Sequence, residues 1–167
     1  TDPQKLDLAL SGGGNFVRFK PDSLNGGRLS GLVSFQDTGL DAAKNQLGRL
    51  ALNLAGTLNQ QHHLGQDLAG ALGGNFFSAP APQVNQATTN TGTAALSATI
   101  TDYTQLAASD YRVQYDGANF VLTRLSDNSV TTAATLPHTI DGVDLTVTSG
   151  VMAAGDEFLV RPTFNAA

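Results

Sequence analysis

The 167-residue sequence contains no cysteine. This absence excludes a disulfide framework, zinc sites with thiolate ligands and catalysis by a thiol. Long hydrophobic runs are absent as well, since no stretch approaches the roughly 20 apolar residues that a membrane-spanning helix needs. We therefore expect no membrane insertion. Hydrophobic residues still make up 41% of the chain, which is enough to build a core.

Positive charge is scarce in this chain. Nine Lys and Arg residues stand against fourteen Asp and Glu residues, and the formal net charge is -5. Scattered cations on an acidic chain do not form the basic surface that nucleic acid or an anionic lipid would bind. We therefore expect no nucleic-acid partner.

The strongest pattern in the sequence lies between Gly27 and Gly65. Mostly apolar residues recur there at alternating three- and four-residue steps: Leu29, Val33, Gln36, Leu40, Ala43, Leu47, Leu50 and Leu54. This heptad-like period predicts a helix whose apolar edge packs along other helices. Gly39 and a potential N-cap at Thr38 predict an interruption, with a short helix ending near residue 36 and a longer one at 40–64.

Five leucines on this edge form our candidate site for helix packing and assembly: Leu40, Leu47, Leu50, Leu54 and Leu58. We expect them to secure the core of the subunit, because an apolar helix edge contributes stability only when something covers it. No other segment predicts a comparable helix, so we expect the covering helices to lie outside this sequence. The opposite face of the helix is polar and includes Lys44, Asn45 and Arg49.

Two glycines, Gly48 and Gly56, stand inside the longer helix, where each costs about 1 kcal/mol relative to alanine. Two interpretations are open: the glycines let another helix approach closely, or they face the β region of this same chain. The end of the helix is marked by His62 and His63, which suit the negative end of the helix dipole. We expect Gly65 in the left-handed position that follows many helices.

Short extended segments predict strands on both sides of the helix. Residues 6–10 and 16–20 flank the glycine-rich loop 11–15 and predict a β-hairpin. Residues 78–93, rich in Pro, Ala, Asn, Gln and Thr, predict a linker or irregular loop. Beyond them, runs separated by turn signals predict strands at 96–101, 111–115, 120–125, 130–134, 143–148 and 158–161.

These elements predict an α+β fold that combines a long helical segment with a small antiparallel β domain. We expect three parts: a helical part with the N-terminal hairpin at 1–77, the linker or irregular loop at 78–93, and the β domain at 94–167. The glycine triplet at 12–14 is not a phosphate-binding loop, because no Lys-Ser or Lys-Thr pair follows it.

Residues with catalytic or metal-binding potential are better explained as structural. His62 and His63 point about 100° apart on a helix and are poorly placed to share a zinc ion with Asp67. The segment 141–144 lacks the alternating ligands of a calcium loop and predicts an Asp-Gly turn. Most other aspartates also stand at turn signals, and no nucleophile elbow is present. We therefore expect no metal, no cofactor and no catalytic residue.

Seven segments carry a resemblance to a known family: Gly27–Leu32, Leu40–Ala51, Leu58–His62, Gly65–Leu68, Ser109–Gly117, Leu122–Arg124 and Ala154–Thr163. In this order and spacing they resemble the flagellar hook-associated protein 1 family, and the resemblance covers nearly the whole chain. It implies an internal fragment that lacks both terminal helical regions. It also implies a structural role in the flagellar hook-filament junction, without catalysis.

The resemblance implies partners as well: other copies in the junction ring, the flagellar hook protein and hook-associated protein 3. It implies that terminal helices cover the leucine edge, and it places the protein outside the cell after passage through the flagellar export apparatus. Two other function classes stay in view. One is a surface-exposed or adhesin-like β module on a helical stalk, and the other is a glycosidase, which needs two facing carboxylates about 5 to 9.5 Å apart.

Overall fold

The computed structural model describes residues 9–12, 15–18 and 26–167 of the chain. The chain forms two compact units, Thr1–Ala43 and Lys44–Ala167. Their boundary falls near the beginning of helix α2 (Asp41–His63), so that nearly all of this helix belongs to the second unit.

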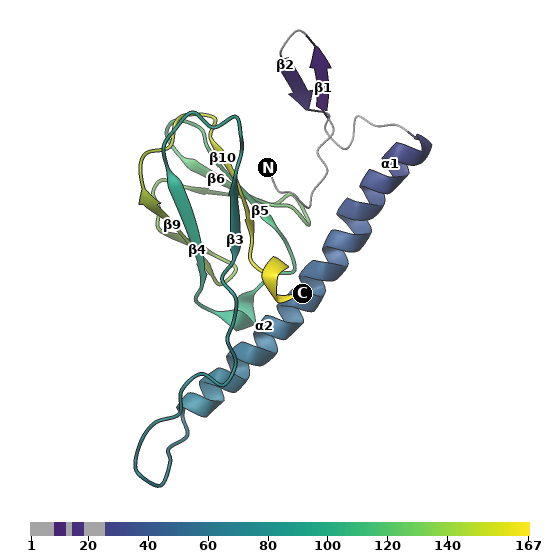
Figure 1. Ribbon diagram of the computed structural model, residues 1–167. Helices are drawn as coiled ribbons and strands as arrows, with labels where there is room; N and C mark the ends of the chain where they lie inside the picture. Colours follow the sequence, from purple (N-terminus) through teal and green to yellow (C-terminus); the bar gives the residue numbers. More distant parts are fainter. Residues whose placement is uncertain (1–8, 13–14, 19–25) are drawn as a thin grey trace. The chain divides into compact units, whose positions relative to one another are not determined.

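The first unit contains a hairpin and the beginning of the helical segment (Figure 1). Strands β1 (Ala9–Gly12) and β2 (Asn15–Arg18) pair antiparallel, which confirms the predicted hairpin. Residues 6–8, 13–14 and 19–20 of that prediction lie outside the described residues. Helix α1 (Gly27–Ser34) and the π-helical segment η2 (Phe35–Leu40) lead directly into α2.

The π-helical segment η2 replaces the interruption predicted at Gly39. The backbone N–H of Asp41 donates to the carbonyl of Gln36, five residues earlier. The Thr38 hydroxyl donates to the carbonyl of Ser34 at 2.7 Å and therefore does not cap a new helix. A π turn accommodates an extra residue while the helical hydrogen bonding continues. The predicted break and N-cap are wrong for this reason.

Helix α2 matches the predicted longer helix but ends differently from the prediction. Gly65 is not among the glycines with positive φ. The N–H groups of Leu64 and Gly65 instead donate to the carbonyls of Gln61 and His62, at 3.2 and 3.0 Å. These tighter three-residue turns satisfy the last carbonyls, so the left-handed conformation predicted at Gly65 is wrong.

Among the described residues, none of the helices has the length and hydrophobicity that a membrane span requires.

The second unit contains two antiparallel sheets (Figure 1). One sheet has the order β3 (Gln83–Gln86), β10 (Glu157–Arg161), β5 (Tyr111–Tyr115), β6 (Phe120–Arg124) and β7 (Val130–Ala133). The other has the order β4 (Ala95–Ile100), β9 (Val143–Ser149) and β8 (His138–Ile140). Both sheets contribute to one core, which includes Leu96, Ala98, Val113, Leu122, Val143, Leu145, Phe158 and Val160. The predicted α+β class with a small antiparallel β domain is confirmed.

The six strands predicted for the β domain all form, and two further strands were missed. Strand β3 lies in the segment 78–93 and pairs with β10, so the expectation of irregular structure is wrong for Gln83–Gln86. Strand β8 has three residues and pairs with β9. Asp141 and Gly142 join β8 to β9 with φ values of 46° and 74°. This positive pair is what the predicted two-residue Asp-Gly turn requires.

Candidate functional site: the two faces of helix α2

The face of α2 that packs on the β domain combines two glycines and two amide side chains with one leucine. Its buried residues are Asn45, Gly48, Leu52, Gly56 and Asn59. A Cβ at Gly48 would overlap the carbonyl oxygen of Thr163, and a Cβ at Gly56 would overlap the Tyr103 ring. Thr163 precedes the short helix η4 (Phe164–Ala166), and Tyr103 opens the short helix η3 (Tyr103–Gln105). The two glycines therefore face the chain's own β domain, which decides between the two open interpretations.

Two buried amides hold this face in place. The Thr163 hydroxyl donates to Asn45 Oδ1 at 2.7 Å. Asn59 Oδ1 accepts from the N–H groups of Phe76 and Phe77 at 2.8 Å each, and Asn59 Nδ2 donates to the Phe77 carbonyl at 2.8 Å. The sequence analysis placed Asn45 on the polar face of the helix and did not single out Asn59. Together with Gly48, Leu52 and Gly56 they recur at steps of three and four residues, and this spacing is the helical signal that could have identified them.

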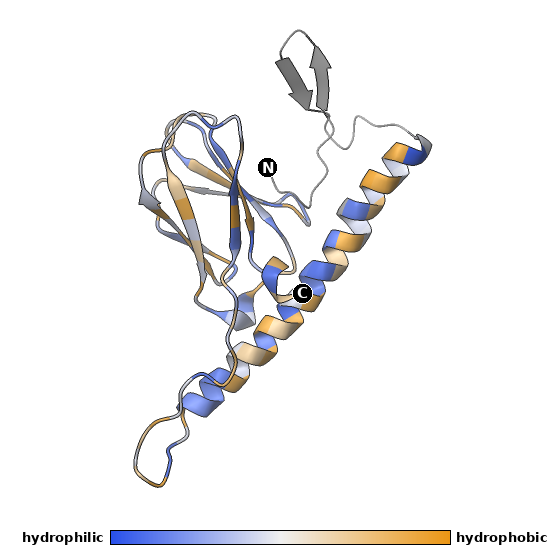
Figure 2. Cartoon of the chain, in the orientation of Figure 1, coloured by the Kyte–Doolittle hydropathy of each residue, from blue (hydrophilic) through white to orange (hydrophobic). Residues whose placement is uncertain are grey.

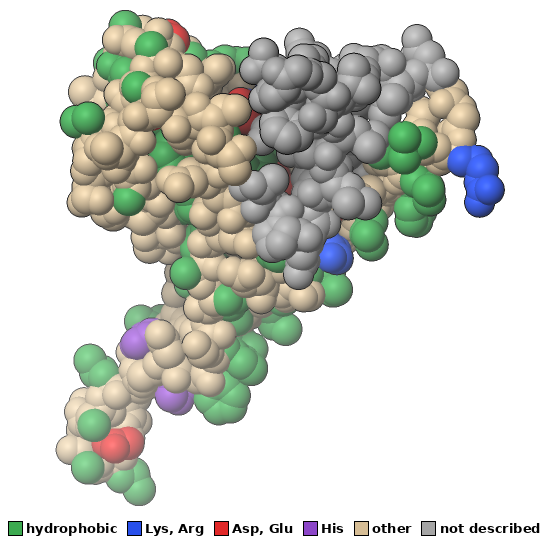
Figure 3. Space-filling model, turned by 45° about the horizontal axis from the view of Figure 1, so that its top comes forward, with side chains coloured by type: hydrophobic (Ala, Val, Ile, Leu, Met, Phe, Trp, Pro, Cys, Tyr) green, Lys and Arg blue, Asp and Glu red, His purple; other side chains and the backbone are tan. Residues whose placement is uncertain are grey.

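The opposite face of α2 carries four of the five predicted assembly leucines, and the fifth, Leu40, is the last residue of η2. All five are exposed. The exposed fractions are 44% for Leu40, 57% for Leu47, 67% for Leu50, 60% for Leu54 and 43% for Leu58. Leu52, which was not among the predicted residues, is the leucine of α2 that enters the core, with 1% exposure. Figure 2 shows the apolar residues along the helix, and Figure 3 shows hydrophobic side chains gathered along it. Contiguous exposed leucines of this kind usually mark an interaction surface.

Beside the leucine face lies an apolar groove of about 310 Å³. Its lining comes from α2, from the segment that follows Phe77 and from η4: Ala51, Leu52, Leu54, Ala55, Phe77, Ser78, Ala79, Pro80, Asn165 and Ala166. None of these side chains carries a charge, so the groove suits an apolar, uncharged occupant.

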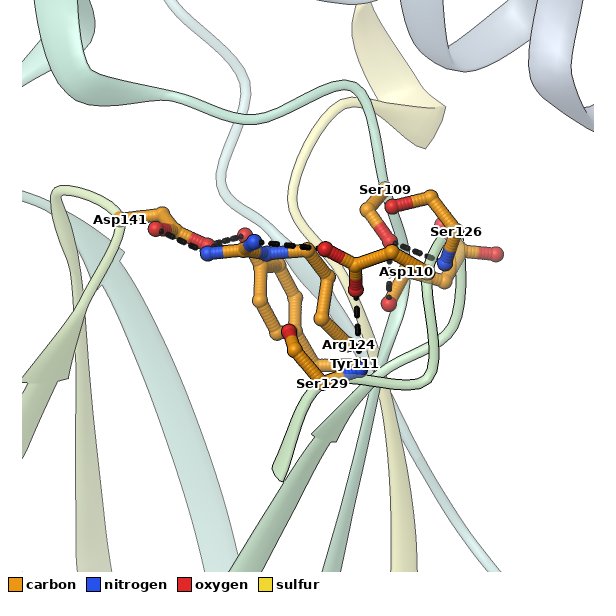
Figure 4. A network of polar contacts seen from close by, with 8 residues as sticks. Ser109, Asp110, Tyr111, Arg124, Ser126, Ser129 and Asp141 are labelled. Atoms are coloured by element: carbon orange, nitrogen blue, oxygen red, sulfur yellow. Dashed lines mark hydrogen bonds and ion pairs between the residues drawn. The ribbon is translucent and has the colours of Figure 1, made fainter. Parts of the chain in front are cut away.

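Several ionisable residues of the β domain make structural contacts with one another. Arg124 holds Asp141 through Nε and Nη2, at 2.9 and 2.7 Å, and the Tyr111 hydroxyl donates to the same carboxylate at 2.5 Å (Figure 4). Burial, reinforced by the bond to Asp141, raises the pKa of Tyr111. Arg161 Nε lies 3.0 Å from Asp110 Oδ2 in a buried ion pair. Such contacts join the strands and leave these groups poorly placed to transfer protons.

The turn aspartates behave as the sequence predicted. Asp116 Oδ1 accepts the N–H groups of Ala118 and Asn119, and these bonds hold the pKa of Asp116 below its usual value. Asp127 Oδ1 accepts the N–H of Ser129, and this bond also lowers the pKa of Asp127. A carboxylate stabilised in its charged form by backbone donors fixes a turn.

The two histidines of the last turn bind the loop that follows α2. His62 Nδ1 lies 2.7 Å from the carbonyl oxygen of Gly74, and His63 Nε2 lies 2.7 Å from Asn75 Oδ1. Asp67 Oδ1 accepts two N–H groups of its own loop. Among the described residues, no group of three or more His, Cys, Asp or Glu side chains is arranged to hold a metal ion.

Two family models match the chain, one on each side of residue 80. Residues 1–77 match the helical domain of the flagellar hook-associated protein FlgK, and residues 85–162 match a D2-like domain of flagellar hook-associated protein 1. The chain belongs to the flagellar hook-associated protein 1 family. The family resemblance predicted from the sequence is therefore confirmed.

Individual members of the hook-associated protein 1 family agree with this assignment. Flagellar hook-associated protein 1 of Escherichia coli K12 is 36% identical over 169 residues, and that of Salmonella typhimurium LT2 is 37% identical over 171 residues. Each alignment covers 99% of this chain but 31% of the relative. The solved hook junction protein FlgK from Burkholderia pseudomallei is 41% identical, with a TM-score of 0.84 over 92% of this chain and 28% of that structure. The chain thus spans about a third of the curated relatives' length.

Proposed function

We propose that this chain is a structural segment of the hook-filament junction of the bacterial flagellum, and that it acts by assembly and not by catalysis. The observation that carries this proposal is the exposed leucine face of α2, formed by Leu47, Leu50, Leu54 and Leu58. Leu40, at the end of η2, is exposed as well. Family membership supports it, because the matched relatives bear the names of a hook-associated or hook junction protein.

The leucine face is available for assembly because the other face of α2 already holds the β domain. Burial of a leucine side chain contributes about 1.5–3 kcal/mol, so several leucines left 43% to 67% exposed represent a large unrealised stabilisation. Helices that cover this face would gain that free energy. We propose that, in the full-length protein, the terminal helical segments cover the leucine face. There is room for such segments, because this chain spans only 31% of the length of its curated relative.

Membership of the same family also supports a proposal about the neighbours of this protein in the flagellum. Other copies of the protein, the flagellar hook protein and hook-associated protein 3 are the proposed neighbours in the junction. The protein reaches this extracellular position through the flagellar export apparatus. An unfolded chain without cysteine suits such a route, because no disulfide forms before export.

A double substitution in the full-length protein, Leu50→Asp with Leu54→Asp, tests the leucine face. Both residues are more than half exposed in this chain, so the β domain keeps its fold while the junction fails to assemble. The measurements are motility and the amount of the protein in isolated hook structures. Val130→Asp is the matched control, because Val130 is an apolar residue of similar exposure, 60%, that belongs to β7 and not to α2. Normal junctions in the double variant would refute the proposal.

A further inference from the structure

Three large apolar side chains precede Leu40 in the helical segment, and all of them are exposed. Leu29 and Leu32 in α1 and Phe35 at the beginning of η2 are 51%, 66% and 67% exposed. Helix α1 lies entirely within the described residues and buries none of its side chains. The helical turn formed by η2 determines which of the three points in the same direction as Leu40.

The spacing in the sequence favours Leu29. Leu40 and Ala43, which belong to the same compact unit as α1 and η2, mark one side of the helical segment, and we call this side the Leu40 edge. In an uninterrupted α-helix each residue turns by about 100°, so Leu29 would lie within about 10° of the middle of this edge. Phe35 would lie about 110° away from it. The α-helical period therefore assigns Leu29 to the Leu40 edge and Phe35 to another side.

The π turn of η2 exchanges these two residues. The N–H of Asp41 donates to the carbonyl of Gln36, so the hydrogen bond spans five residues. Such a turn holds one residue more than an α-helical turn, and it rotates the residues before it by about 100° relative to those after it. Phe35 then falls within about 10° of the middle of the Leu40 edge, and Leu29 lies about 110° away. Leu32 lies about 50° from the middle of the edge with either kind of turn.

Side chains of η2 itself support this turn. The Thr38 hydroxyl donates to the carbonyl of Ser34 at 2.7 Å, a local bond of the kind that bends helices. A Cβ at Gly39 would stand 3.3 Å from two carbons of the Phe35 ring. The glycine thus leaves room for the ring to lie against the backbone of the π turn. Turns of this kind occur mostly singly and often at functional sites.

We propose that the π turn of η2 brings Phe35, and not Leu29, into the assembly surface beside Leu40, and that the terminal helical segments of the full-length protein cover both residues. The inference rests on the assembly role proposed above and adds Phe35 to the residues that perform it. The terminal segments are the occupant because this chain spans 31% of the length of its curated relative, and Phe35 is left 67% exposed within it. Burial of the Phe35 ring would remove apolar surface from water and favour this contact.

Thiol labelling tests the role of Phe35, because this chain has no cysteine of its own. Phe35→Cys and Leu29→Cys are made singly in a full-length background without other cysteines, and Leu50→Cys is the reference for the leucine face. In residues 1–167 alone, all three thiols should react with a soluble maleimide at similar rates, since the replaced side chains are between 51% and 67% exposed. In the unassembled full-length protein, Phe35→Cys and Leu50→Cys should react at least about tenfold more slowly than Leu29→Cys.

The labelling pattern separates this inference from the proposed function. Fast labelling of Phe35→Cys together with slow labelling of Leu50→Cys would overturn this inference alone. Fast labelling of both would refute the covering of the leucine face and the function proposed from it. Slow labelling of Leu29→Cys in place of Phe35→Cys would show an uninterrupted α-helix and overturn the role of the π turn. Protection of Phe35→Cys that arises only on assembly would place a neighbouring copy there and refute the terminal segments as the occupant.

Deletion of Thr38 provides a second measurement. It removes the extra residue, so that α1 and α2 join as one α-helix and Leu29 moves onto the Leu40 edge. In the full-length protein the two labelling rates should then be exchanged, with Leu29→Cys at least about tenfold slower than Phe35→Cys. Thr38→Ala keeps the number of residues and is the matched control, in which Phe35→Cys should remain the slower of the two. Unchanged rates after the deletion would contradict the role of the π turn.

Discussion

Replacing Gly48 by alanine sets two effects of opposite sign against each other. In a free helix, alanine is preferred over glycine by about 1 kcal/mol. In this structure, however, the new methyl group would overlap the carbonyl oxygen of Thr163 and stand 3.0 Å from both its carbonyl carbon and its Cβ. A backbone carbonyl cannot turn aside as the end of a flexible side chain can, so either α2 or the segment that contains Thr163 must shift.

The cost of that shift exceeds the gain in helix propensity. Overpacking a close contact costs about 1–3 kcal/mol, and a backbone obstacle belongs to the upper part of that range. The shift also disturbs two hydrogen bonds of Thr163: its hydroxyl donates to Asn45 Oδ1 at 2.7 Å, and its carbonyl accepts the Ala166 N–H at 3.1 Å. After subtraction of the propensity gain, we expect a loss of about 2 kcal/mol, which lowers Tm by about 4–8 °C.

Thermal and urea unfolding of residues 1–167, followed by circular dichroism, measures this loss. Gly31→Ala in α1 is the matched control, since a Cβ at Gly31 would meet nothing within 4 Å. That variant should retain the stability of the parent or gain about 0.5–1 kcal/mol. If Gly48→Ala were as stable as the parent, the close packing of α2 on Thr163 would be refuted.

Two further predictions concern buried polar groups. Asn59→Ala leaves the N–H groups of Phe76 and Phe77 without their acceptor, so it should cost about 1–3 kcal/mol and raise amide hydrogen exchange at both residues, whereas Asn53→Ala should not. The N–H of Ala153, and after it those of Thr91 and Gly92, hold the pKa of Asp156 below its ordinary value. Its charge therefore stabilises the fold above the unfolded pKa of about 3.9, and this contribution is lost as the pH falls through the lower folded pKa. Urea midpoints measured from pH 5 to pH 2 should fall less steeply for Asp156→Asn, and an unchanged slope would contradict this.

The sequence predicted the elements that depend on local chemistry. Strands β5 and β6 alternate apolar and polar residues around a turn rich in Asp, Gly and Asn, and the structure forms both at the expected positions. The missed strands lack this signal. Gln83–Gln86 is polar apart from Val84 and is a strand because its backbone pairs with β10, while β8 has three residues, too few for a period of two to be visible.

The sequence could not decide which face of α2 the β domain covers. Leucines and small or amide residues both recur with helical spacing, and hydrophobicity favoured the leucines as the buried set. The structure instead buries Asn45, Gly48 and Asn59 with Leu52. That choice depends on the shapes of Thr163 and Tyr103, which lie far from α2 in the sequence and meet it only after folding.

The contacts at Gly48 and Gly56 determine how α2 is rotated about its own axis. A helix held only by leucines can turn about its own axis and still bury apolar surface, because the hydrophobic effect has no preferred direction. The Thr163 carbonyl and the Tyr103 ring occupy the space that a Cβ at Gly48 or Gly56 would fill. These two contacts can form in only one rotation of the helix about its axis. The β domain therefore fixes the rotation of α2 about its own axis. This rotation determines the direction in which Leu47, Leu50, Leu54 and Leu58 point toward a neighbouring helix.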